Sequence, residues 1–183
     1  MAGSSSLDES LNKEAYVLFT LRETRYDFET DADSEKLMQR HFESQGFSVL
    51  NNSFAAIYRP ARVKNPEPDI IMTRILGADR LNWVAEFFDA VFAGDAGRDV
   101  IPGQPDLFVY REDGSDKFFC EVKKGGDVLS ACQMMGISVI HTMLNCRVEV
   151  ARVNKAPRTY RWTWPNVQAL HPDREIFIGP PGR

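Results

Sequence analysis

Two short apolar runs, a tight turn between them and a glycine pair after them constrain this fold most strongly. The segments 106–110 (DLFVY) and 117–123 (KFFCEVK) are rich in aromatic and β-branched residues, and Asp113-Gly114 lies between them. Such spacing predicts two strands joined as a β-hairpin. The run Lys124-Gly125-Gly126 then predicts a hinge into a helix, which we expect to be capped by Asp127 and to continue to about residue 145.

Helices and strands are expected on both sides of this hairpin. Apolar periodicity predicts helices at 34–45 and 80–92. Strand composition is found at 15–21, within 47–58, at 147–153 and at 158–164. The segment Arg59 to Pro68 is predicted to be a proline-broken loop, and Asp69 a turn or strand-start residue. The order of elements indicates an α/β fold, with a central mixed β-sheet flanked by helices.

The length suits one domain with a single core. The chain has 183 residues, of which 43% are hydrophobic, and it shows no internal repeat. Residues 1–30 are expected to form a flexible N-terminal lead with a possible strand, and residues 31–165 the main domain. Within that domain, 51–100 is interpreted as an insert, and 166–183 is expected to be a proline-rich tail.

Several classes of protein are not expected from this composition. No apolar run reaches about 18 residues, and no basic-then-apolar leader occurs, so we expect neither a membrane span nor secretion. A cytoplasmic or nucleoid-associated protein is expected instead. The three cysteines form no CxxC pair, which argues against a disulfide framework or a zinc site. The chain lacks GxxxxGK[ST], so ATP use is not expected.

Basic residues are concentrated locally, although the net charge is −4. Affinity for phosphates depends on such local patches rather than on net charge. Tyr160, Trp162 and Trp164 alternate with basic and polar residues, a pattern that suits either base stacking or a half-buried strand. The candidates for nucleic-acid contact are Lys124, Arg147, Arg152, Lys155, Arg158 and Arg161.

The hairpin carries a group of residues with catalytic potential. Alternate residues of a strand share a face, so Glu121 and Lys123 are predicted to point the same way. Asp106 opens the neighbouring strand, and cross-strand pairing can bring its carboxylate near Glu121. Oxygen ligands of this kind suit Mg²⁺ or Mn²⁺. Lys123 can then offset negative charge, and Gln133 can donate to a phosphate oxygen or to a water.

Neither half of this pattern is informative alone. An acid and a lysine on a strand face are usually solvated, and Pro-Asp occurs a second time at Pro68-Asp69. No Glu-x-Lys follows that second Pro-Asp at hairpin distance. The order of the motifs is therefore what singles out the first site.

That order resembles the PD-(D/E)xK nuclease superfamily, and more narrowly its VRR-NUC (virus-type replication-repair nuclease) domain. The family pattern is GxPD, then ExK, a glycine-rich turn and LSxxQ. The close match spans 103–133. The matching residues are Gly103, Pro105, Asp106, Glu121, Lys123, Leu129, Ser130 and Gln133.

The resemblance implies a restriction-endonuclease-like core and metal-dependent cleavage of DNA. It makes Asp106, Glu121 and the Val122 carbonyl oxygen ligands of Mg²⁺ or Mn²⁺, Lys123 the catalytic lysine and Gln133 a further catalytic-site residue. Members also carry an acid on the first helix. Glu35 is the matching candidate, with Glu43 as its competitor.

The function expected from the resemblance is a homodimeric endodeoxyribonuclease of DNA repair. Its substrate would be branched or structured DNA, such as a Holliday junction or a flap. Two alternatives stay open. One is a sequence-specific restriction-type endonuclease with 51–100 as its recognition insert. The other is a module on the same fold that binds nucleic acid without cutting it.

Overall fold

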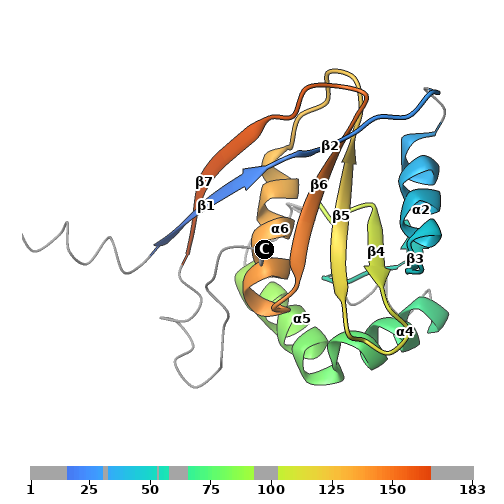
Figure 1. Ribbon diagram of the computed structural model, residues 1–183. Helices are drawn as coiled ribbons and strands as arrows, with labels where there is room; N and C mark the ends of the chain where they lie inside the picture. The colour runs from blue at the N-terminus through green and yellow to red at the C-terminus, as the bar shows by residue number, and fades with distance from the viewer. Residues whose placement is uncertain (1–15, 31–32, 53, 58–65, 93–102, 166–183) are drawn as a thin grey trace, which may run out of the picture.

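A five-stranded mixed sheet forms the centre of the computed structural model, which describes residues 16–30, 33–52, 54–57, 66–92 and 103–165 (Figure 1). The start of the predicted lead, to residue 15, and the predicted tail at 166–183 lie outside the described residues. The elements are β1 (Tyr16–Arg22), β2 (Thr24–Tyr26), α2 (Ser34–Ser44), β3 (Ser48–Asn51), α4 (Pro66–Leu76), α5 (Ala78–Phe92), β4 (Leu107–Tyr110), β5 (Lys117–Lys123), α6 (Ala131–Met143), β6 (Arg147–Val153) and β7 (Thr159–Pro165).

The strand order of the sheet is β2-β6-β5-β4-β3. β6 runs parallel to both β5 and β2, whereas β4 is antiparallel to β5 and to β3. The predicted α/β class, with a central mixed sheet flanked by helices, is confirmed. In the hairpin, Leu107 pairs with Cys120, so β5 continues for three residues, 121–123, past the beginning of β4.

Helices cover both faces of the sheet (Figure 1). Alternate side chains of β4 and β5 divide between two apolar clusters, as the two-residue period of a strand requires. Leu107 and Cys120 face α2, where they pack with Met38. The opposite cluster is larger and lies beneath α6, α4 and α5. Its buried members from the hairpin are Phe108, Tyr110 and Phe119.

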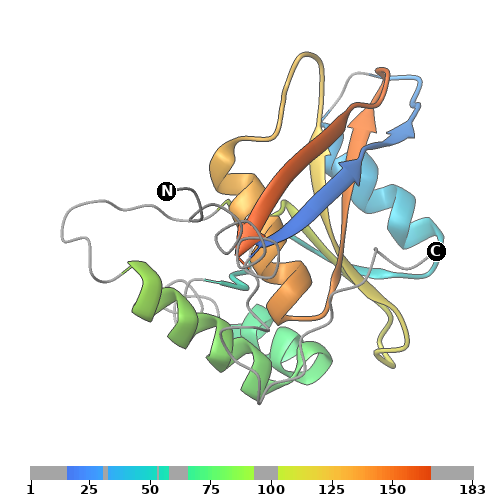
Figure 2. The same cartoon turned by 90° about the vertical axis from the view of Figure 1, so that its left-hand side faces the viewer.

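β1 and β7 pair as a separate antiparallel ribbon that lies across the outer side of α6 (Figure 2). The Trp162 indole N–H donates to Ser138 Oγ on α6 at 2.8 Å. Phe19 stacks on Trp162 with ring centroids 5.2 Å apart. β2 follows β1 directly and forms an edge of the main sheet. Residues 16–26, which the sequence placed in a lead with a possible strand, form β1 and β2.

Three local predictions are wrong. The segment from Pro66 is helical rather than looped, and Asp69 lies in the first turn of α4. Proline is tolerated there because the first backbone N–H groups of a helix have no partner within it. Asp127 does not cap α6. Ser130 does, by accepting a hydrogen bond from the Gln133 backbone N–H through its Oγ at 3.2 Å.

The residues before Asp106 cross α6 at very short range. Gly103 N–H donates to the Cys132 carbonyl at 2.8 Å. A Cβ added to Gly136 would lie 2.0 Å from the Gly103 carbonyl oxygen, so that position of α6 must be glycine. The Gln104 side chain bonds Ala56 N–H at 2.6 Å and the Phe54 carbonyl at 2.7 Å. These contacts fix the point from which β4 begins.

Within the described ranges, no helix is both long and apolar enough to cross a membrane.

Candidate active site

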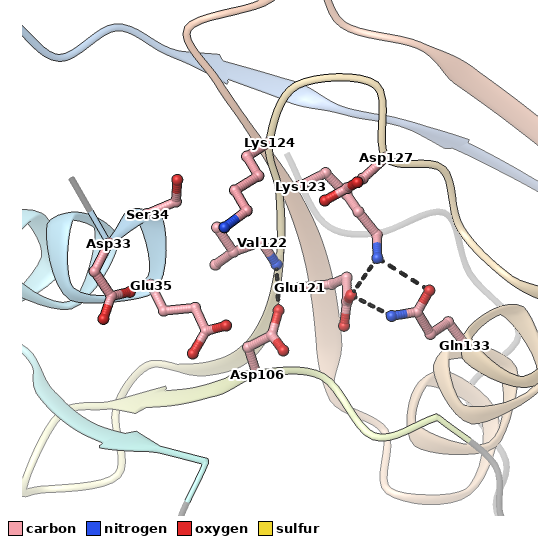
Figure 3. A pocket seen from close by; sticks show the side chains of 10 residues that line it. All are labelled: Asp33, Ser34, Glu35, Asp106, Glu121, Val122, Lys123, Lys124, Asp127 and Gln133. Atoms are coloured by element: carbon pink, nitrogen blue, oxygen red, sulfur yellow. Dashed lines mark hydrogen bonds and ion pairs between the residues drawn. The ribbon is translucent and has the colours of Figure 1, made fainter. Parts of the chain in front are cut away.

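A cavity of about 220 Å³ lies where β5 extends beyond the beginning of β4 (Figure 3). The first residues of α2 and α6 border it. The four residues predicted to be catalytic are brought together here, and Glu35 joins them. The lining residues are Asp33, Ser34, Glu35, Asp106, Glu121, Val122, Lys123, Lys124, Asp127 and Gln133.

Asp106 is held against the exposed edge of β5. Its Oδ2 accepts the Val122 backbone N–H at 2.7 Å. In a strand, the N–H and C=O groups of any one residue point to the same edge, and those of the next residue point to the opposite edge. The Val122 carbonyl therefore also faces the gap that β4 leaves open beside Asp106. This geometry is compatible with the predicted role of that carbonyl as a metal ligand, which stays a prediction.

Glu121 and Lys123 share one face of β5, as strand parity predicts. Lys123 Nζ lies 2.7 Å from Glu121 Oε1. Both side chains are almost fully buried, and Glu121 is only 1% exposed. Burial of an ion pair removes two charges from water, so the pair requires further polar partners. Gln133 supplies them to both members.

Gln133 connects the α6 cap to the ion pair. Its Oε1 accepts the Ser130 backbone N–H and Lys123 Nζ, each at 3.0 Å. Because both donors occupy the oxygen, the amide nitrogen turns toward Glu121 Oε1 and donates at 2.5 Å. The LSxxQ motif is thus a helix-capping box whose glutamine also orients two charged side chains. In this structure Gln133 is oriented toward the protein side chains, whereas the sequence suggested a contact to phosphate or water.

Glu35 enters the cavity from the first turn of α2. Figure 3 shows its carboxylate beside those of Asp106 and Glu121. Asn52 holds it in place, because the Asn52 side-chain amide donates to Glu35 Oε2 and the Asn52 backbone N–H donates to the Asp106 carbonyl at 2.9 Å. Glu43, the competing candidate, is exposed and bonded by Gln39 at 2.8 Å, away from the cavity lining.

Burial raises the pKa of all three carboxyl groups, and the charge of Asp106 raises that of Glu35 and Glu121 further. Burial is the largest cause for Glu121, and the charge of Asp106 adds to it, so the pKa of Glu121 reaches about 7 although Lys123 lowers it. Burial likewise raises the pKa of Asp106, against the Val122 N–H bond. Burial and then Asp106 raise the pKa of Glu35. Perturbed carboxyl groups gathered in a cavity are typical of functional sites.

The donor set suits a hard divalent cation. Among the described residues, no group of three His, Cys, Asp or Glu side chains is arranged so that it could hold a metal ion alone. Mg²⁺ does not need such a group, since it usually keeps several waters and binds through one or two carboxylates and a substrate phosphate. Asp106 and Glu121, with the Val122 carbonyl, offer that number of oxygen ligands.

The predicted basic patch is not one surface. Arg152 is 0% exposed and bonds both oxygens of Glu23, at 2.7 and 2.5 Å, so the prediction that it contacts nucleic acid is corrected here. Arg147 pairs with Phe118 in register and lies over its ring at 4.0 Å, at the end of β5 remote from the cavity. Lys124 lines the cavity. The remaining predicted contacts, Lys155, Arg158 and Arg161, are exposed.

Sequence reasoning missed Glu23 and Asn52. Glu23 is 3% exposed between two strands, and nothing local marks it as buried. Asn52 has a φ of 49°, a left-handed conformation that asparagine adopts more readily than most residues. The pair Asn51-Asn52 before an apolar segment was the available signal for such a turn.

Comparison with known proteins gives only a distant structural likeness. No family model matches the chain, and no curated protein matches it in sequence. Among solved structures, the chain is similar to paFAN1 bound to DNA with a two-nucleotide 5′ flap and a gap, at 13% identity and a TM-score of 0.41. The match covers 73% of this chain, which spans 37% of the length of that one.

Proposed function

We propose that this chain is a divalent-metal-dependent DNA endonuclease of the VRR-NUC type, which hydrolyses phosphodiester bonds in branched or structured DNA. One observation carries the proposal. Glu35, Asp106 and Glu121 come from three different elements and border one cavity beside Lys123. Three acids that oppose one another's ionisation are costly unless a cation is shared among them.

Asp106, Glu121 and the Val122 carbonyl would hold Mg²⁺ or Mn²⁺, and Glu35 would reach the ion directly or through a water. When bound, the ion would polarise a phosphate oxygen and lower the pKa of a bound water. The Asp106 carboxylate is already oriented for this role, because one of its oxygens is fixed by Val122 N–H.

Lys123 supplies a positive charge at a defined place. Glu121 and Gln133 hold its ammonium group at 2.7 and 3.0 Å inside the cavity. A fixed donor in a site that excludes water stabilises the charge that develops on an attacked phosphate more strongly than one in bulk solvent. Gln133 ties the side chains of Lys123 and Glu121 to the first turn of α6. The distance between the Glu121 carboxylate and the Lys123 ammonium group is therefore set by β5 and α6 rather than by a loop.

The preference for branched DNA rests on what the described elements offer. Their helices pack on the sheet, and none has the features of a helix that reads base edges in a major groove. Exposed cations, such as Lys124 in the cavity lining and Arg158 beside the loop that follows β5, suit phosphates of any sequence. A homodimer would place two such sites on a symmetric junction. Size-exclusion chromatography with light scattering tests that part.

The decisive comparison is among DNA substrates. We expect cleavage of a four-way junction or a flap near the branch with Mg²⁺ or Mn²⁺, and little cleavage of plain duplex. Cleavage of plasmid DNA at one defined sequence would instead support a restriction-type enzyme. Binding of branched DNA without cleavage under every metal condition would support a non-cleaving module.

A further inference from the structure

The interior next to the cavity contains a second charged cluster that the proposed chemistry does not use. Glu23, between β1 and β2, pairs with Arg152 on β6, and both are almost fully buried. Four donors surround the Glu23 carboxylate. Besides the two from Arg152, the Tyr160 hydroxyl and the Arg158 backbone N–H each donate at 2.8 Å.

Such a pair is a weak source of stability, because desolvation offsets most of its attraction. We therefore consider what the Glu23–Arg152 pair holds in position rather than how much it stabilises the fold. Arg152 is paired in register with Lys123, and it reaches from the sheet toward the loop that follows β5.

That loop, residues 124–128, is held by its carbonyl groups. Arg152 donates to the Asp127 carbonyl at 2.7 Å and to the Gly125 carbonyl at 3.5 Å. The Arg158 side chain donates to the Gly126 and Asp127 carbonyls, each at 3.4 Å. Three consecutive carbonyls thus face two guanidinium groups, whereas the side chains of the loop are exposed.

A trans peptide unit is planar, so a hydrogen bond that holds its carbonyl group also restricts the orientation of the N–H on the other side of the same unit. The donors on these carbonyls therefore restrict the side of the loop that faces the cavity as well. Two residues of the loop, Lys124 and Asp127, line the cavity. Figure 3 shows the Lys124 amine directed toward Val122, on the side of the cavity that faces α2. Lys124 is the exposed cation closest in sequence to the catalytic lysine.

We propose that the buried Glu23–Arg152 pair is a positioning device, which holds the 124–128 loop so that Lys124 meets a phosphate of the DNA backbone at the mouth of the cavity. Arg152 acts through Lys124 and touches no DNA itself. The phosphate partner rests on the proposed function, whereas the hold on the loop does not.

A double-mutant cycle tests the proposal in full-length protein. In an Asp106→Asn background, binding of a fluorescent flap DNA is measured against salt concentration. Lys124→Ala is expected to weaken binding roughly three- to tenfold and to reduce the salt slope by about 1. Arg152→Lys is expected to do the same although it is buried, and the double variant no more. Lys117→Ala, at the far end of β5, is the control that should leave both quantities unchanged.

Hydrogen exchange supplies a readout that needs no DNA. The Asp127 N–H donates to the Lys124 carbonyl across the loop at 3.0 Å. We expect its exchange to accelerate several-fold in Arg152→Lys and in Tyr160→Phe, with amides of α2 unaffected. If Arg152→Lys does not fold, Tyr160→Phe decides, because it removes only one hydroxyl from the cluster.

Three results would overturn the inference. Additive losses in the double variant would show that Arg152 does not act through Lys124. Unchanged Asp127 exchange in a protein that still cleaves DNA would remove the positioning role and leave the proposed function intact. Accelerated exchange in a protein that binds no DNA would remove the phosphate contact together with the proposed function.

Discussion

Asp106→Asn is expected to stabilise the metal-free protein while it abolishes cleavage. The pKa of Glu121 rises from 4.5 to about 7, first through burial and next through the charge of Asp106. At 1.36 kcal/mol per pH unit, the ionised form of Glu121 costs the native state about 3 kcal/mol. The charge of Asp106 is one cause of this cost, so removal of that charge should increase the free energy of unfolding by roughly 1 kcal/mol. The amide oxygen of the new residue can still accept the Val122 N–H.

The sign of the effect depends on pH. The native pKa of Glu121 lies above the unfolded value, so the ionisation cost is absent below pH 4.5 and fully present once the pH exceeds about 7. Asp106→Asn should therefore raise the free energy of unfolding at pH 8 and change it less at pH 5. The measurement is thermal or urea unfolding in EDTA, where about 1 kcal/mol corresponds to a Tm rise of roughly 2–4 °C.

A matched control is Asp69→Asn, which alters the other Pro-Asp of the chain. Asp69 lies in the first turn of α4, where a negative charge is favourable, so this variant should lose a few tenths of a kcal/mol. Mn²⁺ should raise the Tm of wild type and of Asp69→Asn, but not that of Asp106→Asn. A lower Tm for Asp106→Asn in EDTA at pH 8 would refute the account of mutual carboxylate repulsion.

Three further predictions concern the same site. Asn52→Gly keeps the left-handed backbone but removes the amide that holds Glu35, so calorimetry should show roughly tenfold weaker Mn²⁺ binding at unchanged Tm. If Asn52→Gly weakens Mn²⁺ binding by the same factor in a Glu35→Gln background, the amide does not act through Glu35. Mn²⁺ affinity should rise as pH increases through about 7, where Glu121 loses its proton, and a flat profile from pH 6 to 8 would disagree. Gln133→Glu retains a capping-box residue but places a second carboxylate beside Glu121, so the ascending limb of the pH–rate profile should move to higher pH. An ascending limb at the wild-type pH would show that the contact between residue 133 and Glu121 does not affect the reaction.

The hairpin, and the strand face to which its candidate site residues point, could be predicted because both depend on local rules. A two-residue period places Glu121 and Lys123 on one face, and Asp113-Gly114 marks the turn. The position of Asp106 followed from its place at the beginning of the adjacent strand. These relations involve residues less than twenty positions apart, so pattern and turn chemistry were sufficient.

The burial of Arg152 could not be predicted in the same way. Its partner Glu23 is 129 positions away, on a segment that pairs in parallel with β6, and no local pattern specifies that pairing. Parity did place Arg152 on the face of Val148 and Val150, but a charged residue on that face needs a known partner before burial can be inferred.

Two other errors had signals in the sequence. Gln133 stands three residues after Ser130, which is the spacing of a capping box, whereas Asp127 has no such residue after it. Proline at Pro66 and Pro68 suggested a loop, yet both positions fall in the first turn of α4, where proline costs no helical hydrogen bond.

The initial rate of cleavage of a four-way junction or a flap, with Mn²⁺ and with EDTA, tests the central claim most directly. The account predicts cleavage near the branch by wild type, none in EDTA, and a loss of at least roughly 10²-fold in both Asp106→Asn and Lys123→Met. Either variant cutting as fast as wild type would contradict the assignment of the site. Absence of cleavage by wild type with both Mg²⁺ and Mn²⁺ would contradict the nuclease itself.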